Sequence, residues 1–332
     1  MDKNEMPLTS PEANESVKTD KKGALKKVFC AVAFILILLL LLLSVSYALQ
    51  PKSDAQKLMK DIKPNGLLAE KDNTIDVVFF GDSEAYTSFS PVQMWAENGF
   101  TGFVCASSSQ YVSLTDSFVK DALKHQNPKV IVLEPYCFFR KLRNDNVFMT
   151  KLENTFSVFQ YHNRWKEIIP LKTSNDYTWK DDLKGFKYMN VTTGVKSKKY
   201  MDKKCKPEFI PEVNQKYIED INNLCRENGT KLVFISTTSL KNWNKEKHSA
   251  VQALADRLGV DYLDLNLEKD VKINWPTDTA DRGDHLNFKG AKKVSAFVGS
   301  YLSKKYSLED KRGNPDFESW NELAKSYKLL GK

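Results

Sequence analysis

Short apolar runs alternate with polar, helix-like stretches along most of this chain. The runs that predict buried strands are residues 76–80 (DVVFF), 103–106 (FVCA), 129–133 (KVIVL), 231–236 (KLVFIS) and 261–265 (DYLDL). Helices are predicted between them and after the last one, at about 114–125, 211–229, 245–258 and 287–304. Strands that alternate with helices predict a parallel sheet covered on both faces. The expected fold is therefore a three-layer α/β/α domain of the flavodoxin-like type.

Two regions depart from this alternation. Residues from about 140 to 210 are rich in Lys, Asn, Thr and aromatics and have no clean period. We interpret them as an insertion beside the carboxyl edge of the sheet, where substrates of such folds bind. The tail from residue 306 carries Trp320, Leu323, Tyr327 and Leu330 at helical spacing, which predicts an amphipathic closing helix.

The longest apolar run is near the N-terminus, at residues 28–49 (VFCAVAFILILLLLLLSVSYAL), and contains no charge. About 20 apolar helical residues cross a hydrocarbon core of about 30 Å. Lysines just before the run, as at 21, 22, 26 and 27, hold that flank in the cytoplasm. We therefore predict a cytoplasmic tail at 1–27, a single transmembrane helix at 28–49, a linker at 50–74, an extracytoplasmic α/β domain at 75–305 and the closing helix at 306–332.

A cleaved signal peptide is the alternative interpretation of the same run. Ser46 and Ala48 fit the small-x-small cleavage pattern. The leucine-rich stretch is longer than a signal core of about 7–15 residues, which favours a retained anchor. Both interpretations place the domain outside the cell.

The formal charge of +8 resides mostly on the exported part. A basic exported surface suits anionic polymers such as teichoic acids, and it is equally typical of charge that keeps a domain soluble. Because the domain is predicted to lie outside the cell, no nucleic-acid partner is expected. The cysteines outside the anchor, at 105, 137, 205 and 225, have neither metal-ligand spacing nor the density of a disulfide scaffold.

The first motif with chemistry is Gly81-Asp82-Ser83-Glu84, immediately after the first predicted strand. A serine on the turn from a strand into a helix lies at the carboxyl edge of the sheet. Backbone N–H groups at a helix start are free to stabilise an oxyanion while the Ser83 oxygen attacks an ester. The alternative is that Ser83 only caps the helix that follows.

The second motif is a polar turn before the last helix, residues 281–288 (DRGDHLNF). A serine nucleophile needs a base that titrates near neutrality, and His285 is a candidate. That histidine needs a carboxylate to orient it, and Asp284 and Asp281 are both within reach along the chain. The alternative is that His285 only hydrogen-bonds within its loop while Asp284 caps the helix.

Together the two motifs resemble the SGNH (GDSL) hydrolase superfamily, over about residues 75 to 302. Its members are three-layer α/β/α proteins that cleave or transfer acyl groups from a serine. The likeness is closest to an exported Gram-positive branch with a GDSE-like first block and an HLN-x-x-GA last block, here His285-Leu286-Asn287 and Gly290-Ala291. That branch includes the teichoic-acid D-alanine transfer proteins and cell-wall polysaccharide O-acyltransferases. The resemblance implies that Ser83 is the nucleophile and His285 the base.

The chain also departs from the superfamily pattern. The second block, residues 105–110 (CASSSQ), lacks the usual oxyanion glycine, and the third, residues 133–136 (LEPY), lacks the asparagine. The usual Asp-x-x-His spacing is absent because Arg282 stands three residues before His285. Ser107, Ser108 and Gln110 are candidate replacement donors, and a plain turn is the alternative for that run.

Other candidates for substrate binding lie outside these blocks. His162 and Trp165 mix aromatic and polar groups suited to sugars, although packing also accounts for the aromatics. Asn244 follows the fourth strand and could line the groove or cap the next helix. No metal-ligand cluster and no Gly-rich phosphate loop is present in the sequence, so neither a metal nor an organic cofactor is expected.

These observations predict a serine-dependent acyl-ester hydrolase or O-acyltransferase that acts on a cell-envelope polysaccharide or teichoic acid. The family likeness implies a membrane-bound O-acyltransferase as a partner. A non-catalytic envelope binding or assembly module on the same fold is the alternative, favoured by the missing glycine and asparagine.

Overall fold

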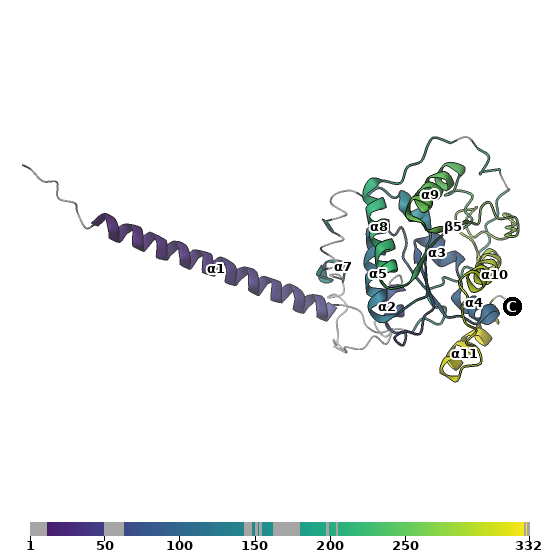
Figure 1. Cartoon of the computed structure of the whole chain (residues 1–332), viewed down its shortest axis with the longest axis horizontal. Helices are drawn as coiled ribbons and strands as arrows, with labels where there is room; N and C mark the ends of the chain where they lie inside the picture. The colour runs from purple at the N-terminus through teal and green to yellow at the C-terminus, as the bar shows by residue number, and fades with distance from the viewer. Residues whose placement is uncertain are drawn as a thin grey trace, which may run out of the picture. The chain divides into compact units, whose positions relative to one another are not determined.

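The chain divides into two units (Figure 1). One contains residues 1–50 and 152–173, and the other contains residues 51–151 and 174–332. The computed structural model describes residues 12–49, 63–142, 148–149, 152, 155–161, 180–196, 199–203, 205–328 and 330.

The first unit is built on α1 (Glu12–Leu49). Its segment Lys22–Leu49 contains an 18-residue window with a mean hydropathy of 3.3 and is long and apolar enough to cross a membrane, as a signal sequence also is. The helix begins well before the apolar run, so residues 12–27 of the predicted cytoplasmic tail are helical. Good helix formers in this stretch, such as Glu, Lys and Ala, account for the extension. The short α7 (Val158–Tyr161) packs on the end of α1, where the Val158 amide donates to Ser46 Oγ at 3.1 Å.

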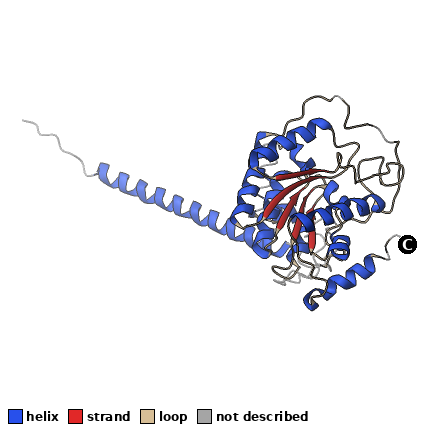
Figure 2. Ribbon diagram, turned by 45° about the vertical axis from the view of Figure 1, so that its right-hand side comes forward, coloured by secondary structure: helices blue, strands red, loops and turns tan. Residues whose placement is uncertain are grey.

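The second unit contains a five-stranded parallel sheet in the order β2-β1-β3-β4-β5 (Figure 2). The strands are β1 (Val77–Gly81), β2 (Gly102–Ala106), β3 (Val130–Leu133), β4 (Lys231–Ser236) and β5 (Asp261–Asp264). This is the doubly wound order of the flavodoxin-like fold. The predicted α/β/α fold class and all five predicted strands are confirmed. Continuous burial of β1, β2 and β3 explains why they appear in the sequence as unbroken apolar runs.

Helices cover both faces of the sheet (Figures 1 and 2). One face packs against α2 (Lys63–Leu68), α5 (Val112–His125), α8 (Glu212–Glu227) and α9 (Lys245–Leu258). The other packs against α3 (Ser83–Ser88), α4 (Pro91–Asn98) and α10 (Phe288–Lys305). Successive strand residues alternate between the two cores: Phe80 and Phe234 face the first, and Phe79 and Ile235 face the second.

The remaining elements are short or peripheral. They are the 3₁₀ turns η1 (Pro135–Phe139) and η3 (Pro315–Phe317), and the C-terminal α11 (Glu318–Tyr327). Trp320 of α11 packs against Trp95 of α4, with ring centroids 5.5 Å apart and the ring planes tilted by 40°, and so attaches the tail to the domain.

The second half of the predicted insertion lies along the sheet. The Val104 amide of edge strand β2 donates to the Lys184 carbonyl at 2.9 Å, which covers part of that edge. Further along, the Arg282 amide donates to the Thr193 carbonyl at 2.8 Å. Residues 192–193 therefore contact the loop that carries His285.

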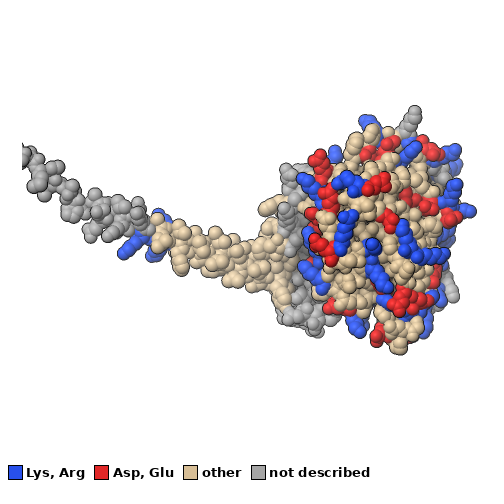
Figure 3. Space-filling view, in the orientation of Figure 1, with Lys and Arg blue, Asp and Glu red and all other residues tan. Residues whose placement is uncertain are grey.

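Charges of both signs are interspersed on the face of the domain seen in Figure 3. Elsewhere in the domain, basic side chains pair with acidic ones, as Arg257 does with Glu219 and Lys305 with Asp261. This pattern is typical of a solvated surface.

Candidate active site

Ser83 lies where β1 turns into α3. A Cβ on Gly81 would lie 2.8 Å from the Glu134 Cβ and 2.9 Å from the Ala85 Cβ, so the tight turn requires glycine. The helix is capped by Asp82, whose Oδ1 accepts from the Glu84 amide at 3.0 Å. Because Asp82 is the cap, the Ser83 hydroxyl is left for another partner.

That partner is the His285 imidazole. Ser83 Oγ lies 2.8 Å from His285 Nε2, and His285 Nδ1 lies 2.6 Å from Asp281 Oδ2. The second candidate carboxylate, Asp284, has its Oδ1 4.0 Å from Nδ1. The distances place serine, imidazole and Asp281 in one hydrogen-bonded line, in which Asp281 holds the proton on Nδ1 and leaves Nε2 to accept from the serine.

A left-handed turn brings Asp281 back onto His285. Arg282 and Gly283 have φ values of 65° and 86°, and the His285 amide donates to Asp281 Oδ1 at 2.7 Å. Thr279 Oγ1 accepts from the Gly283 amide at 2.7 Å and donates to the His285 carbonyl at 2.9 Å. One carboxylate therefore contacts both the backbone and the ring of His285.

Neighbouring segments hold this loop in place. The amides of Leu240 and Lys241, after β4, both donate to the Gly283 carbonyl, at 2.9 and 3.1 Å. α10 is capped by Asn287, whose Oδ1 accepts from the amides of Lys289 and Gly290. Asp284 is therefore not the cap of this helix.

Behind Ser83 and His285 lies a hydrogen-bond network centred on Asn242. Its Nδ2 donates to Glu84 Oε1 at 2.6 Å and to Asp284 Oδ1 at 2.5 Å. The Tyr136 hydroxyl donates to its Oδ1 at 3.3 Å. The Asn242 side-chain amide thus links four segments of the chain. They are the segments that follow β1, β3 and β4, and the loop before α10.

Three buried acids surround the start of α3: Asp82, Glu84 and Glu134 are each at most 1% exposed. Asp82 is paired with Arg140, whose Nη2 lies 2.5 Å from Oδ2. Burial and the neighbouring Asp82 raise the pKa of Glu84 well above its ordinary value. Burial, Asp82 and Glu84 raise the pKa of Glu134 in the same way. Burial therefore favours the acid form of both side chains.

The predicted oxyanion donors are engaged elsewhere. Gln110 Oε1 accepts from the amide and the hydroxyl of Ser107, at 2.9 and 3.0 Å, and its Nε2 donates to Thr115 Oγ1 at 2.8 Å. Ser108 Oγ lies 2.9 Å from the Tyr86 hydroxyl. Ser107 and Gln110 therefore stabilise their own turn, as the alternative interpretation held, and the prediction that they donate to an oxyanion is not supported by these contacts.

The other predicted binding residues have separate outcomes. Asn244 caps α9, with its Oδ1 accepting from the Lys247 amide at 2.8 Å, which confirms the capping alternative, while a role in substrate binding stays a prediction. His162 and Trp165 lie outside the described residues. No role in this network was predicted for Glu84 or Asn242. The signal for Glu84 was a carboxylate in the turn directly after a fully apolar strand.

The site also contains a group of potential metal ligands. Single ligand atoms of Glu84, Asp284 and His285 lie within 4.8 Å of one another. Both ring nitrogens of His285 already have partners in Ser83 and Asp281. The geometry therefore favours acid–base use of this histidine over metal binding.

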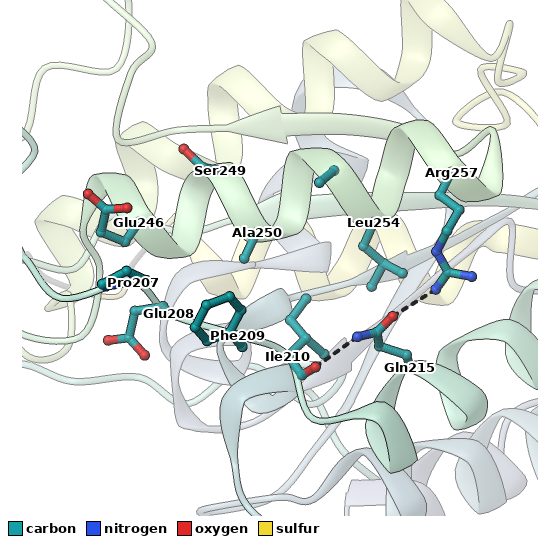
Figure 4. A pocket seen from close by; sticks show the side chains of 11 residues that line it. Pro207, Glu208, Phe209, Ile210, Gln215, Glu246, Ser249, Ala250, Leu254 and Arg257 are labelled. Atoms are coloured by element: carbon teal, nitrogen blue, oxygen red, sulfur yellow. Dashed lines mark hydrogen bonds between the residues drawn. The ribbon is translucent and has the colours of Figure 1, made fainter.

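A separate groove lies between the start of α8 and α9 (Figure 4). It has a volume of about 460 Å³ and apolar walls that include Phe209, Ile210 and Leu254. At one end Gln215 accepts from Arg257 at 2.9 Å and donates to the Ile210 carbonyl at 2.8 Å. None of the residues that line this groove belongs to the Ser83 site.

The fold is similar to that of solved hydrolases at low sequence identity. A candidate acylhydrolase from Bacteroides fragilis matches 76% of this chain and 98% of its own, at 13% identity and a TM-score of 0.38. A GDSL-like lipase from Bacteroides thetaiotaomicron matches 69% and 88%, at 12% identity and 0.33. A psychrotrophic esterase of a Pseudoalteromonas species matches 69% and 97%, at 7% identity and 0.33. No protein-family model and no curated protein matches the chain.

The raised pKa of Glu84 predicts how stability depends on pH. The folded state holds this proton above the ordinary value of 4.5, whereas the unfolded state releases it there. Glu84 therefore lowers the free energy of unfolding as pH rises from about 4.5 toward its folded pKa. We expect Glu84→Gln to reduce this decline, measured by chemical denaturation of the detergent-solubilised chain over a pH series. The exposed Glu309→Gln is the control, and an unchanged pH slope in Glu84→Gln would contradict the assignment.

Proposed function

We propose that this protein is a serine-dependent acyl-ester hydrolase or O-acyltransferase that acts on a cell-envelope polymer outside the membrane. The observation that carries the proposal is the contact of Ser83 Oγ with His285 Nε2 at 2.8 Å, with Asp281 at 2.6 Å on the other ring nitrogen. A nucleophile, a base and an orienting carboxylate in this arrangement perform acyl transfer on several unrelated folds.

The reaction proceeds in two balanced steps. Ser83 Oγ attacks the carbonyl carbon of an ester while His285 Nε2 takes the serine proton, which gives a tetrahedral oxyanion. The ester C–O bond then breaks, the leaving alcohol takes the proton from His285, and an acyl-serine remains. Water or a sugar hydroxyl attacks this ester in turn, with His285 again as base, and free Ser83 is restored.

The groups around the imidazole support this assignment. Asp281 is the orienting carboxylate of the proposal, because it is the one within hydrogen-bonding distance of Nδ1. The Ser83 amide begins α3 and has no acceptor within that helix, so it is the oxyanion donor that this site offers. The proposed chemistry uses only side chains and backbone of this chain.

The apolar segment of α1 supports a location at the membrane surface. In this proposal Lys22–Leu49 anchors the protein in a single pass with its N-terminus inside, and the domain acts on envelope polysaccharide or teichoic acid. A domain held there could receive acyl groups from a membrane-bound O-acyltransferase. Both the polymer substrate and this partner are part of the proposal.

Removal of either reacting group should abolish activity. For Ser83→Ala and His285→Ala we expect turnover of a model acetyl ester to fall by about a thousandfold or more, because each removes an atom of the proton-transfer line. The measurement is the steady-state rate of the detergent-solubilised full chain. Ser249→Ala and His125→Ala, which alter exposed or half-exposed residues on other helices, are matched controls. Full activity of Ser83→Ala with the controls unchanged would refute the proposal.

The location can be tested separately. We expect the full-length chain to stay in the membrane fraction after an alkaline wash, because about 20 apolar helical residues hold it in the bilayer. Protease added outside intact protoplasts should digest the α/β domain and leave the N-terminal segment. Release into the medium of a chain that begins after Ala48 would instead identify residues 1–48 as a cleaved signal.

A further inference from the structure

Two carboxylates face the His285 imidazole at different distances. Asp281 Oδ2 is 2.6 Å from Nδ1 and forms the hydrogen bond, whereas Asp284 Oδ1 is 4.0 Å away. A carboxylate at that separation no longer acts as a hydrogen-bond acceptor, but its charge still stabilises an imidazolium. The position of Asp284 therefore requires an explanation of its own.

Asn242 supplies that explanation. Its single Nδ2 donates to Asp284 Oδ1 at 2.5 Å and to Glu84 Oε1 at 2.6 Å, so each of its two hydrogens has one acceptor. Its Oδ1 accepts from the Tyr136 hydroxyl at 3.3 Å, which fixes the orientation of the amide. Without Asn242, nothing in these contacts would hold Asp284 Oδ1 on the imidazole side.

Glu84 is the buried acceptor of the second hydrogen bond from Asn242. Its side chain follows the nucleophile directly in sequence and is 1% exposed. Its Oε2 has no hydrogen-bond partner among the described residues, and no ion pair with a described Lys, Arg or His involves it. An ionised carboxylate in this setting would be costly. Glu84 therefore serves as a neutral acceptor that anchors Asn242.

We propose that Asn242, anchored by Glu84, is a positioning residue that holds Asp284 as a second, purely electrostatic carboxylate beside His285. The inference rests on the proposed function, since it concerns the base of that reaction. Asp281 fixes the tautomer, and Asp284 adds negative charge that stabilises the imidazolium when the serine proton is transferred.

Other charged groups lie on the segments that surround the site and contribute to its electrostatics. Lys241, from the loop after β4, lies 3.5 Å from Asp284 Oδ2 and draws that carboxylate toward solvent. The remaining groups are Asp82 with Arg140 at the start of α3, Glu84 in α3, Glu134 after β3, Lys247 in α9, Lys187 near Tyr86 and the exposed Arg282. Asn242 thus acts against the pull of Lys241.

The test is a double-mutant cycle read out as a pH profile. In Asp284→Asn the acid limb of kcat/KM on a model acetyl ester should move down by about one pH unit, because a negative charge near the imidazolium is lost. Asn242→Ala should shift the limb in the same direction, because Lys241 then draws Asp284 away. The double variant should show no further shift beyond Asp284→Asn, since both changes remove one interaction.

Two further variants separate positioning from general damage. Glu84→Gln keeps a neutral acceptor and should leave the acid limb in place. Asn222→Ala removes a buried amide of α8 whose Nδ2 donates to the Leu258 carbonyl at the end of α9, and should lower stability without moving the limb. Asp284→Asn alters a partly exposed side chain and keeps the test decisive if Asn242→Ala fails to fold.

The outcomes distinguish this inference from the proposed function. An unmoved acid limb in Asp284→Asn, or additive shifts in the double variant, would overturn the inference while loss of activity in Ser83→Ala still supported the enzyme. A shift in Glu84→Gln equal to that in Asp284→Asn would show that Glu84 carries a charge and would also overturn it. Activity that survives in Ser83→Ala would instead refute the proposed serine-dependent reaction, on which this inference rests.

Discussion

The contact between Ser83 Oγ and His285 Nε2 is the interaction on which the rest of the site depends. It joins residues 202 positions apart at 2.8 Å. The packing of α10 beside the α3–α4 segment maintains it: Ser295 Oγ of α10 donates to the Ser88 carbonyl at 3.0 Å and accepts from the Ser90 amide at 2.9 Å. Proton transfer requires this range, so a shift of about 1 Å between the two segments would interrupt it.

The electrostatics around that contact are unusual for a protein interior. Three carboxyl groups are buried beside the nucleophile, and one of them, Asp82, has a cationic partner in Arg140. Burial of Glu84 and Glu134 lowers stability near neutral pH relative to acidic pH, because each must keep a proton that the unfolded chain releases. Buried carboxyl groups that lower stability in this way are typical of functional sites, where the geometry of the reacting groups matters more than stability.

The sequence predicted the layers for a simple physical reason, because buried parallel strands appear as unbroken apolar runs. The carboxyl ends of these strands share one edge, which placed Ser83 there. That His285 meets Ser83 was implied only by the resemblance of the two motifs to a known superfamily. The choice between Asp281 and Asp284 could not be made, because it depends on the left-handed turn at Arg282 and Gly283. Spacing alone does not show which way such a turn folds back.

Polar residues in loops were the hardest to assign from sequence. Gln110 and Asn244 had the right chemistry and the right edge of the sheet, yet each satisfies its own local backbone or turn. The link between Glu84 and Asn242 spans 158 residues and joins two loops whose approach is set by the order of β1, β3 and β4. Only the assembled sheet brings them together.

The most direct measurement is the mapping, by mass spectrometry, of the adduct that a fluorophosphonate forms with the full-length chain. An activated serine is phosphonylated, and we expect one adduct on the peptide that contains Ser83, strongly reduced in His285→Ala. A folded chain without an adduct at Ser83, or with an undiminished adduct after removal of the imidazole, would show that His285 does not activate Ser83.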